Sequence, residues 1–295
     1  PTRAGLLTGR YQQRSGISGV VNADPNHPAH KLGLLQGEFT FAGALKSAGY
    51  RTALFGKWHL GYAVKFNPVH RGFDEFRGFV SGNIDYHSHL DRMNTPDWWH
   101  GTKLVARDGY LTDLITQDAV RFIGDHRDEP FCLYVAHGAV HSPIQAPDSA
   151  PVRGGSRGPK DGRARDEKVK LMMKSLDDSV TSILAAVRKN GIAGSTLVLF
   201  FSDNGGAAHM RCDPLRGKKG TVWEGGHRVP AIAWWPGTIA KGTKTDQLCI
   251  SLDVMPTMLE LAGLESPPNC KLDGISLVPL LRDRQTLGPR ELFWN

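Results

Sequence analysis

Charged and imidazole side chains follow directly after three short apolar segments of this sequence. The segments are residues 51–55, 131–136 and 196–201, and they lead into Lys57 and His59, His137 and His141, and Asp203 and Asn204. Segments of this length and composition are typical of buried β-strands. In open α/β sheets the ligand site lies beyond the carboxyl ends of the strands. The three clusters are therefore expected to form one polar site.

Asp203 and Asn204 offer a carboxylate and an amide oxygen side by side, followed by Gly205 and Gly206. Such oxygens are the ligands that Ca²⁺ and Mg²⁺ prefer, and the glycines would let the backbone turn so that both side chains face one ion. Asn-Gly is also frequent in plain turns. Taken alone the dipeptide favours a turn, so the metal hypothesis depends on the neighbouring clusters.

Lys57 and His59 lie two residues apart and share one face if the strand continues that far. The lysine supplies a positive charge, and the imidazole titrates near neutrality. His137 and His141 have the spacing of zinc-binding helices, but the acidic residue of that motif is absent and Pro143 disfavours a helix. We interpret His137 as structural and His141 as the candidate site residue.

Residues 214–230 place three cations between glycines ahead of an apolar segment. An ordered loop of this kind can bring a lysine to a bound anion, although a solvated basic loop has the same composition. Together the clusters supply lysines, histidines and hard oxygen ligands without a pair of acidic catalysts. This inventory favours cleavage of a sulfate or phosphate ester, because shifting charge on several anionic oxygens needs several aimed donors. It contains no nucleophile.

Elements able to position these side chains alternate along the chain. Apolar periodicity predicts helices over 38–49, 112–125, 168–190 and 253–263 and strands over 51–55, 131–136, 196–201 and 231–235. Thr40 and Thr112 are predicted N-caps, and Gly49 is expected in the left-handed conformation. The strand over 196–201 is expected to be buried on both faces. The alternation predicts one α/β domain with a largely parallel or mixed sheet.

The chain has 295 residues, of which 40% are hydrophobic, as in globular proteins. Residues 151–170 hold seven basic and three acidic residues, so most of the net charge of +7 lies in one segment. We expect this segment to be a solvated loop and expect no nucleic-acid partner. No run of about 18 apolar residues predicts a membrane span. The spacing of the four cysteines indicates neither a zinc site nor a disulfide framework, and it leaves their disulfide state open.

Two segments resemble the signatures of the sulfatase family. Residues 1–10 (PTRAGLLTGR) resemble the end of C-x-P-x-R-x-x-x-L-T-G-R, beginning at its proline, and residues 49–61 (GYRTALFGKWHLG) match the second signature along its whole length. The elements at 141–143, 202–205 and 215–226 follow in the family's order. The similarity covers nearly the whole chain, which therefore resembles an arylsulfatase-like, formylglycine-dependent sulfatase.

The resemblance implies the alkaline phosphatase-like fold, a large mixed and mostly parallel β-sheet sandwiched between helices. It also implies a divalent cation at the strand ends, usually Ca²⁺ with Mg²⁺ possible, and Asp203 and Asn204 would bind it. The family nucleophile is a formylglycine made from a cysteine or serine, and its hydrate attacks sulfur. The composition of the chain alone indicates neither the divalent cation nor the formylglycine.

Five further residues match family positions that act on the sulfate group. By this resemblance Arg3 would hold the formylglycine and its hydrate. Lys57 and Lys219 would bind sulfate oxygens, and Lys219 is chosen over its neighbour because the family lysine directly precedes Gly-Thr. His59 would accept the proton whose removal releases sulfate. His141 would contact sulfate and assist the leaving alcohol.

The resemblance places further family parts outside this chain. The family nucleophile lies two positions before Pro1, the paired metal-binding aspartates lie further upstream, and residues 290–295 resemble the strand that opens a small C-terminal subdomain. We therefore expect residues 1–295 to be a sulfatase catalytic domain truncated at both ends and inactive alone. By analogy the whole protein would need a formylglycine-generating or sulfatase-maturing enzyme and would be exported to the periplasm, the extracellular space or the lysosome.

The predicted reaction is hydrolysis of an aryl or carbohydrate sulfate ester. Two alternatives stay open: hydrolysis of a phosphodiester or phosphonate monoester by the same fold, and a non-catalytic sulfoglycan-binding protein whose nucleophile is lost. Residues 72–89 resemble a substrate-facing loop of arylsulfatase-like and glycan-sulfatase members, but packing among the loop's own aromatic side chains would explain its composition equally well. The sequence leaves the substrate itself undetermined.

Overall fold

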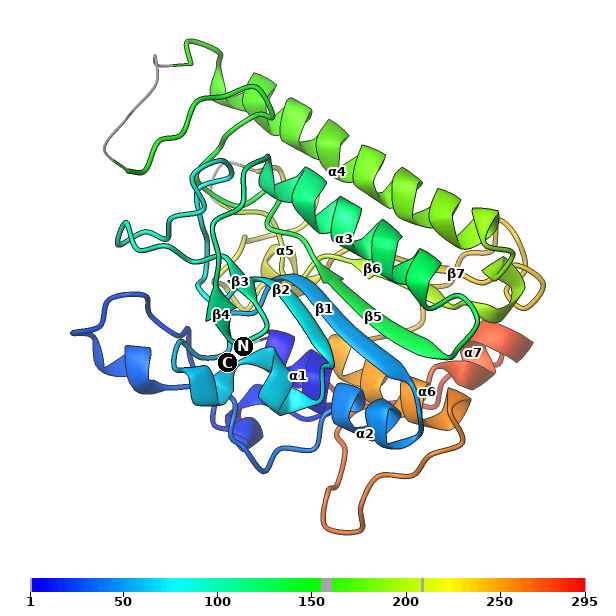
Figure 1. The fold of residues 1–295 in the computed structure, drawn as a ribbon. Helices are drawn as coiled ribbons and strands as arrows, with labels where there is room; N and C mark the ends of the chain where they lie inside the picture. Colours follow the sequence, from blue (N-terminus) through cyan, green and yellow to red (C-terminus); the bar gives the residue numbers. More distant parts are fainter. Residues whose placement is uncertain (1, 155–160, 208–209, 295) are drawn as a thin grey trace.

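A five-stranded mixed sheet forms the centre of the computed structural model, which describes residues 2–154, 161–207 and 210–294 (Figure 1). Its strand order is β4-β3-β2-β1-β5. β1 (Arg51–Lys57) is parallel to both of its neighbours, β2 (Glu75–Phe79) and β5 (Phe131–Ala136). β3 (Trp99–His100) and β4 (Lys103–Leu104) extend the sheet as antiparallel strands. The predicted mixed sheet is confirmed, and its two longer pairings are the parallel ones.

Helices cover both faces of this sheet (Figure 1). α3 (Leu111–Asp125) and α4 (Arg165–Lys189) lie on one face. α1 (Thr2–Thr8), α2 (Phe41–Ser47) and α6 (Val254–Leu261) lie on the other. Two short helices, α5 (Glu224–His227) and α7 (Val278–Asp283), belong to the C-terminal third of the chain. The sandwich of helices around a sheet therefore matches the expected fold class.

β1 supplies side chains to two separate hydrophobic cores. Leu54 packs into the core shared with α1, α2 and α6, whereas Ala53 and Phe55 pack into the core shared with α3. Successive strand residues point to opposite faces of a sheet, so one strand can serve both layers. Each large apolar side chain buried in this way stabilises the fold by about 1.5–3 kcal/mol. The carboxyl end of β1 is consequently held from both sides.

Gly56 explains how β1 and β5 come close at that end. Its φ is +107°, and a Cβ atom at this position would lie 2.1 Å from the carbonyl oxygen of Ala136. Glycine alone fits such a conformation and approach without strain. The residue after it is Lys57, so the glycine fixes where this lysine leaves the sheet.

The helix ends test three local predictions. The Thr40 hydroxyl accepts a hydrogen bond from the Gly43 amide (3.1 Å), and Gly49 has a φ of +87°, so both predictions are confirmed. The predicted cap at Thr112 is wrong, because α3 begins one residue earlier and Thr112 lies inside its first turn. Buried contacts of Leu111 extend this helix beyond the capping signal.

The third predicted strand forms a different structure from the one expected. Within the part of the chain that the structure describes, β6 (Val198–Phe201) pairs only with β7 (Ala231–Trp234), in an antiparallel two-stranded sheet. Phe200 is 41% exposed and Ile232 is 61% exposed. The expectation of burial on both faces is therefore wrong for the described residues. An apolar segment indicates that its side chains favour burial. It does not indicate whether neighbouring strands and helices are present to bury them.

The basic segment 151–170 lies partly outside the described residues, at 155–160. Within its described part, Arg163 forms ion pairs with Asp148 and Asp161, both at 2.8 Å, and Arg153 donates hydrogen bonds to Asn83. The segment then continues into α4, so these parts are not a freely solvated loop. No described helix combines the length and apolarity that crossing a membrane requires. All four cysteines are free thiols in this structure.

Candidate active site

One cavity of about 2270 Å³ collects all seven residues that the sequence singled out as a site. They are Arg3, Lys57, His59, His141, Asp203, Asn204 and Lys219. The cavity lies beyond the carboxyl ends of β1, β5 and β6, as expected for an α/β sheet. His137 is not among its lining residues; it is half-buried, and Ser179 lies within hydrogen-bond distance of its Nε2 (3.2 Å). The structural interpretation of His137 fits this placement.

Arg3 joins the elements around the cavity. From α1, its Nη1 donates to the carbonyl oxygen of Lys57 and to the hydroxyl of Tyr134, both at 3.0 Å. Its Nη2 lies 3.4 Å from a carboxylate oxygen of Asp203. One guanidinium thus fixes the ends of β1 and β5 and the loop after β6 relative to one another. Sequence reasoning missed Tyr134, and the available signal was a tyrosine in an apolar strand, since a buried phenol needs a hydrogen-bond partner.

Lys57 is buried among other cations. Only 6% of its surface is exposed, and no described residue accepts a hydrogen bond from its ammonium group. Burial and the nearby charges of Arg3 and Lys219 lower the pKa of Lys57 to about 7, while Asp203 opposes the shift. The site therefore holds a lysine that gains its charge most readily when an anion is bound beside it.

His59 is held as a neutral imidazole by its surroundings. Its backbone is in the left-handed region (φ +59°), and its Nε2 donates to the carbonyl oxygen of Val21 at 3.1 Å. The proton is thus on Nε2, which leaves Nδ1 as an acceptor. Burial and the charge of Lys57 keep the pKa of His59 well below its usual value. Gly82 packs against this ring, since a Cβ there would lie 2.8 Å from Nε2.

His141 reaches the same cavity from the loop after β5. Its Nδ1 donates to the carbonyl oxygen of Ser142 at 3.0 Å, so Nε2 is the position free to exchange a proton. Tyr86 donates from its hydroxyl to the backbone oxygen of His141 at 3.1 Å and steadies the loop. Burial, together with the charges of Lys57 and Lys219, lowers the pKa of His141. Both site histidines are therefore neutral in the absence of a bound anion.

Asp203 and Asn204 present adjacent oxygen ligands, as predicted. The Asn204 amide donates to one Asp203 carboxylate oxygen, and Arg3 pairs with the other. Burial alone would raise the pKa of Asp203, but Arg3, Lys57 and Lys219 lower it below its usual value, so this carboxylate is ionised. The chemistry of these donors suits Ca²⁺ or Mg²⁺. No cluster of three potential ligands among His, Cys, Asp and Glu occurs within the described ranges, so the pair would be only part of a metal site.

Lys219 is brought to Asp203 by two interlocked glycine loops. The Gly205 amide donates to the carbonyl oxygen of Gly226 at 2.9 Å, and the Lys219 amide donates to that of Gly206 at 2.8 Å. A Cβ on Gly205 would lie 1.9 Å from the carbonyl oxygen of Gly225, so only glycine permits this approach. Lys219 is exposed and lines the cavity, whereas the adjacent Lys218 does not.

The fold and the cavity agree with comparisons to known proteins. The sequence model of the Sulfatase family matches residues 1–264, so the chain belongs to the sulfatase family. It is similar to N-acetylgalactosamine-6-sulfatase of Mus musculus (35% identity over 321 residues, covering 100% of this chain and 59% of the relative). It is also similar to arylsulfatase A of Bos taurus (36% identity over 317 residues, covering 95% of this chain and 58% of the relative).

A solved structure of Ps i-CgsB in complex with k-i-k-neocarrahexaose superposes on this chain with a TM-score of 0.85. The two share 29% identity, and the match covers 97% of this chain and 66% of the solved one. The chain spans a little over half the length of the curated relatives it matches. Membership of the family and the fold are thus established for these residues.

Proposed function

We propose that the whole protein hydrolyses a sulfate ester, with this chain supplying the groups that bind the sulfate and move protons. The observation that carries the proposal is the convergence of two lysines, two neutral histidines and an arginine on one cavity. Cationic donors aimed at one point suit a group whose oxygens become more negative during the reaction. The sulfatase names of the relatives support the same reaction.

A bound sulfate ester would change the protonation of this site. Its negative charge raises the pKa of Lys57 and of His141, because a nearby anion favours the charged form of each group. Lys57 then binds sulfate oxygens as an ammonium, together with Lys219. His141, protonated at Nε2, can donate to the oxygen of the leaving alcohol. His59 keeps Nδ1 free to accept the proton whose departure releases sulfate.

Two groups outside these side chains complete the proposal. A formylglycine hydrate, made from a cysteine or serine two positions before Pro1 in the full-length protein, would supply the nucleophile. Asp203 and Asn204 would contribute two ligands to a Ca²⁺ ion, or a Mg²⁺ ion, which would add positive charge beside the sulfate oxygens. Arg3 would hold the modified residue, since its guanidinium faces the cavity from α1. A formylglycine-generating or sulfatase-maturing enzyme would then be an obligatory partner.

The proposed substrates are carbohydrate or aryl sulfates. An oligosaccharide is named in the complex of the similar solved structure, and an amino sugar sulfate is named in the murine relative. We further propose export of the protein, by analogy with family members.

The test begins with the full-length gene product, expressed together with a formylglycine-generating enzyme. Mass spectrometry should detect an aldehyde at the residue two positions before Pro1. The matured protein should hydrolyse 4-methylumbelliferyl sulfate faster than the matching methyl phosphodiester. Faster phosphodiester cleavage would support the alternative hydrolase, and calorimetric binding of sulfated glycans without turnover would support a binding protein.

Neighbouring lysines provide a matched control for the site. Lys219→Ala should lower kcat by about 10²–10³, the usual effect of removing one aimed donor from a transition-state site. Lys218→Ala changes the same charge one residue away and outside the cavity lining, so it should leave kcat within about twofold. Equal effects of the two substitutions would contradict the assignment of Lys219.

A further inference from the structure

The cavity extends past the sulfate-binding residues along a wall that the proposed function does not use. Gly82, which packs against the His59 ring, is followed by Asn83, and both line the cavity. Tyr62 and Arg92 line the same wall. Asn83 and Arg92 lie on neighbouring segments of this wall, because Ile84 and Asp91 form an antiparallel bridge.

Arg92 is a cation without a carboxylate partner in the described part of the chain. Its guanidinium is exposed and donates to the side-chain oxygen of Asn22. The adjacent Asp91 is buried, and its carboxylate accepts the backbone amides of Met93 (2.8 Å) and Thr95 (2.9 Å). Asn22 is the one described residue that accepts a hydrogen bond from Arg92, so the other donors of this guanidinium can meet an anion. A guanidinium presents these donors in a planar fork that matches a carboxylate or a sulfate.

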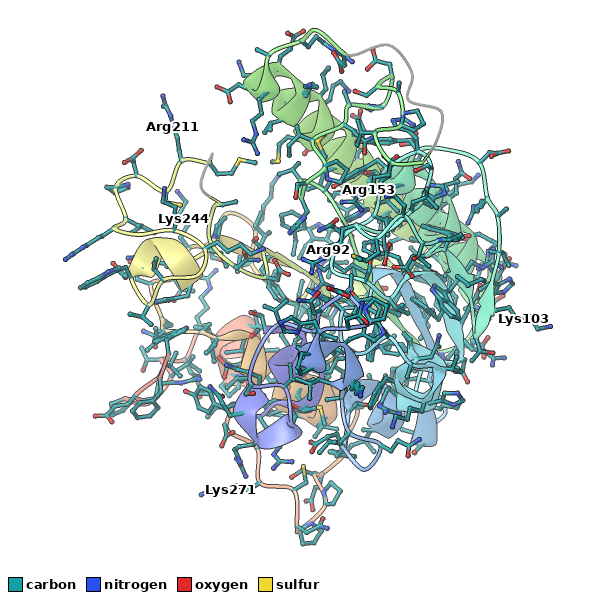
Figure 2. All side chains as sticks on the ribbon, turned by 90° about the vertical axis from the view of Figure 1, so that its left-hand side faces the viewer. Arg92, Lys103, Arg153, Arg211, Lys244 and Lys271 are labelled. Atoms are coloured by element: carbon teal, nitrogen blue, oxygen red, sulfur yellow. The ribbon has the colours of Figure 1, made fainter. Side chains whose placement is uncertain are left out.

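Asn83 is oriented so that it adds a second donor. Arg153 donates to the backbone oxygen of Asn83 at 3.2 Å and to its side-chain oxygen. This arginine lies close enough to Arg92 for their charges to interact, and both are labelled near the middle of the molecule in Figure 2. Because Arg153 occupies the amide oxygen, the Asn83 amide nitrogen is the group left to donate, and no described residue accepts from it.

The charge of the whole cavity agrees with an anionic occupant larger than one sulfate. Among the described residues, eight lysine and arginine side chains line it against three carboxylates. Tyr62 stacks on His30 with ring centroids 4.6 Å apart, which holds an aromatic surface beside Arg92. Such a surface suits the apolar face of a sugar ring.

We propose that Arg92 and Asn83 form a second anion-binding subsite, which binds a sulfate or carboxylate carried by the same glycan as the reacting ester. The subsite rests on the proposed sulfatase function and specifies its substrate as a glycan with at least two anionic groups. Arg153 is a positioning residue in this arrangement, since it acts through Asn83.

The experiment compares Arg92→Gln with the wild-type full-length protein on three disaccharides of the same sugars. One carries only the reacting sulfate, one carries a second sulfate, and one carries a carboxylate instead. The ratio of kcat/KM for a doubly charged over the singly charged disaccharide should fall about tenfold to hundredfold, the range for losing a hydrogen bond to a charged group. Arg92→Lys should restore part of the ratio. Whichever second anion shows the larger fall is the natural occupant.

Lys103→Gln is the control, because it removes the same charge from an exposed position outside the cavity lining (Figure 2). It should leave the ratio unchanged. An unchanged ratio in Arg92→Gln, or an equal fall in Lys103→Gln, would overturn the subsite while leaving sulfatase activity in place.

Calorimetric titration of the same disaccharides separates this proposal from the proposed function. If no sulfate ester is hydrolysed, the sulfatase proposal fails. Loss of preference for the doubly charged ligands in Arg92→Gln would then still support the subsite, and retention of that preference would overturn it.

Discussion

Lys57 offers a direct test of the electrostatics of the site through stability. Its pKa is lowered from 10.5 to about 7, so the folded chain resists protonation that the unfolded chain accepts. At 1.36 kcal/mol per pKa unit, the lowered pKa costs the folded state about 5 kcal/mol at pH 6, where Lys57 is charged, and about 2 kcal/mol at pH 9, where it is neutral and only the unfolded chain holds the proton. The sign follows from proton binding: the unfolded chain holds the extra proton between pH 7 and 10.5, so wild-type stability rises with pH across that window. Lys57→Met keeps most of the side-chain volume and removes the charge.

Urea unfolding of the full-length protein at pH 6, 7, 8 and 9 measures this effect. Lys57→Met should be more stable than wild type at pH 6 by several kcal/mol, and its advantage should shrink steadily towards pH 9. Lys103→Met, at an exposed position, should change stability by less than about 0.5 kcal/mol at every pH. A Lys57→Met protein that is less stable at pH 6, or an advantage that does not vary with pH, would refute the reasoning. The Lys57→Met variant should also bind inorganic sulfate more weakly. This result would show that the Lys57 cation binds anions and does not only destabilise the fold.

Two further substitutions test the geometry around the reacting groups. Tyr134→Phe removes an acceptor from Arg3 and should lower kcat/KM on an aryl sulfate about tenfold with an unchanged near-ultraviolet circular dichroism spectrum; unchanged kinetics would mean that Arg3 needs no support from β5. Gly82→Ala places a Cβ 2.8 Å from Nε2 of His59 and should lower kcat about tenfold to hundredfold by displacing the ring. Gly37→Ala, where nothing lies within 4 Å of the added atom, is the control and should behave as wild type.

Much of the site was predictable because it follows a simple rule of α/β sheets. Lys57, His141 and Asp203 are separated by long stretches of sequence, yet Lys57 ends one strand and the other two residues follow strands, and strand ends converge. Glycines also predicted local backbone conformation correctly: Gly49, at the end of α2, adopts the left-handed conformation expected of it. The cavity collects these residues without any assumption about what it binds.

The parts that sequence reasoning missed depend on tertiary contacts. Tyr134 belongs to an apolar strand, and its role arises only because α1 brings Arg3 against it. Arg153 was assigned to a solvated loop on composition, but its partner Asn83 is distant in sequence, and no local pattern connects them. The exposure of Phe200 likewise depends on which strands lie beside β6, a property of the assembled sheet.

Because β1 packs into both hydrophobic cores and also ends at the active site, substitutions in either core can affect stability and activity together. Ala53 and Leu54 pack into opposite cores, and the same strand ends at the carbonyl oxygen of Lys57 that receives the Arg3 guanidinium. A missense change in either core would therefore reduce both the cellular abundance of the protein and the specific activity of the molecules that remain. Assays that score activity alone would classify such variants with true catalytic lesions, and measuring abundance in parallel would separate the two.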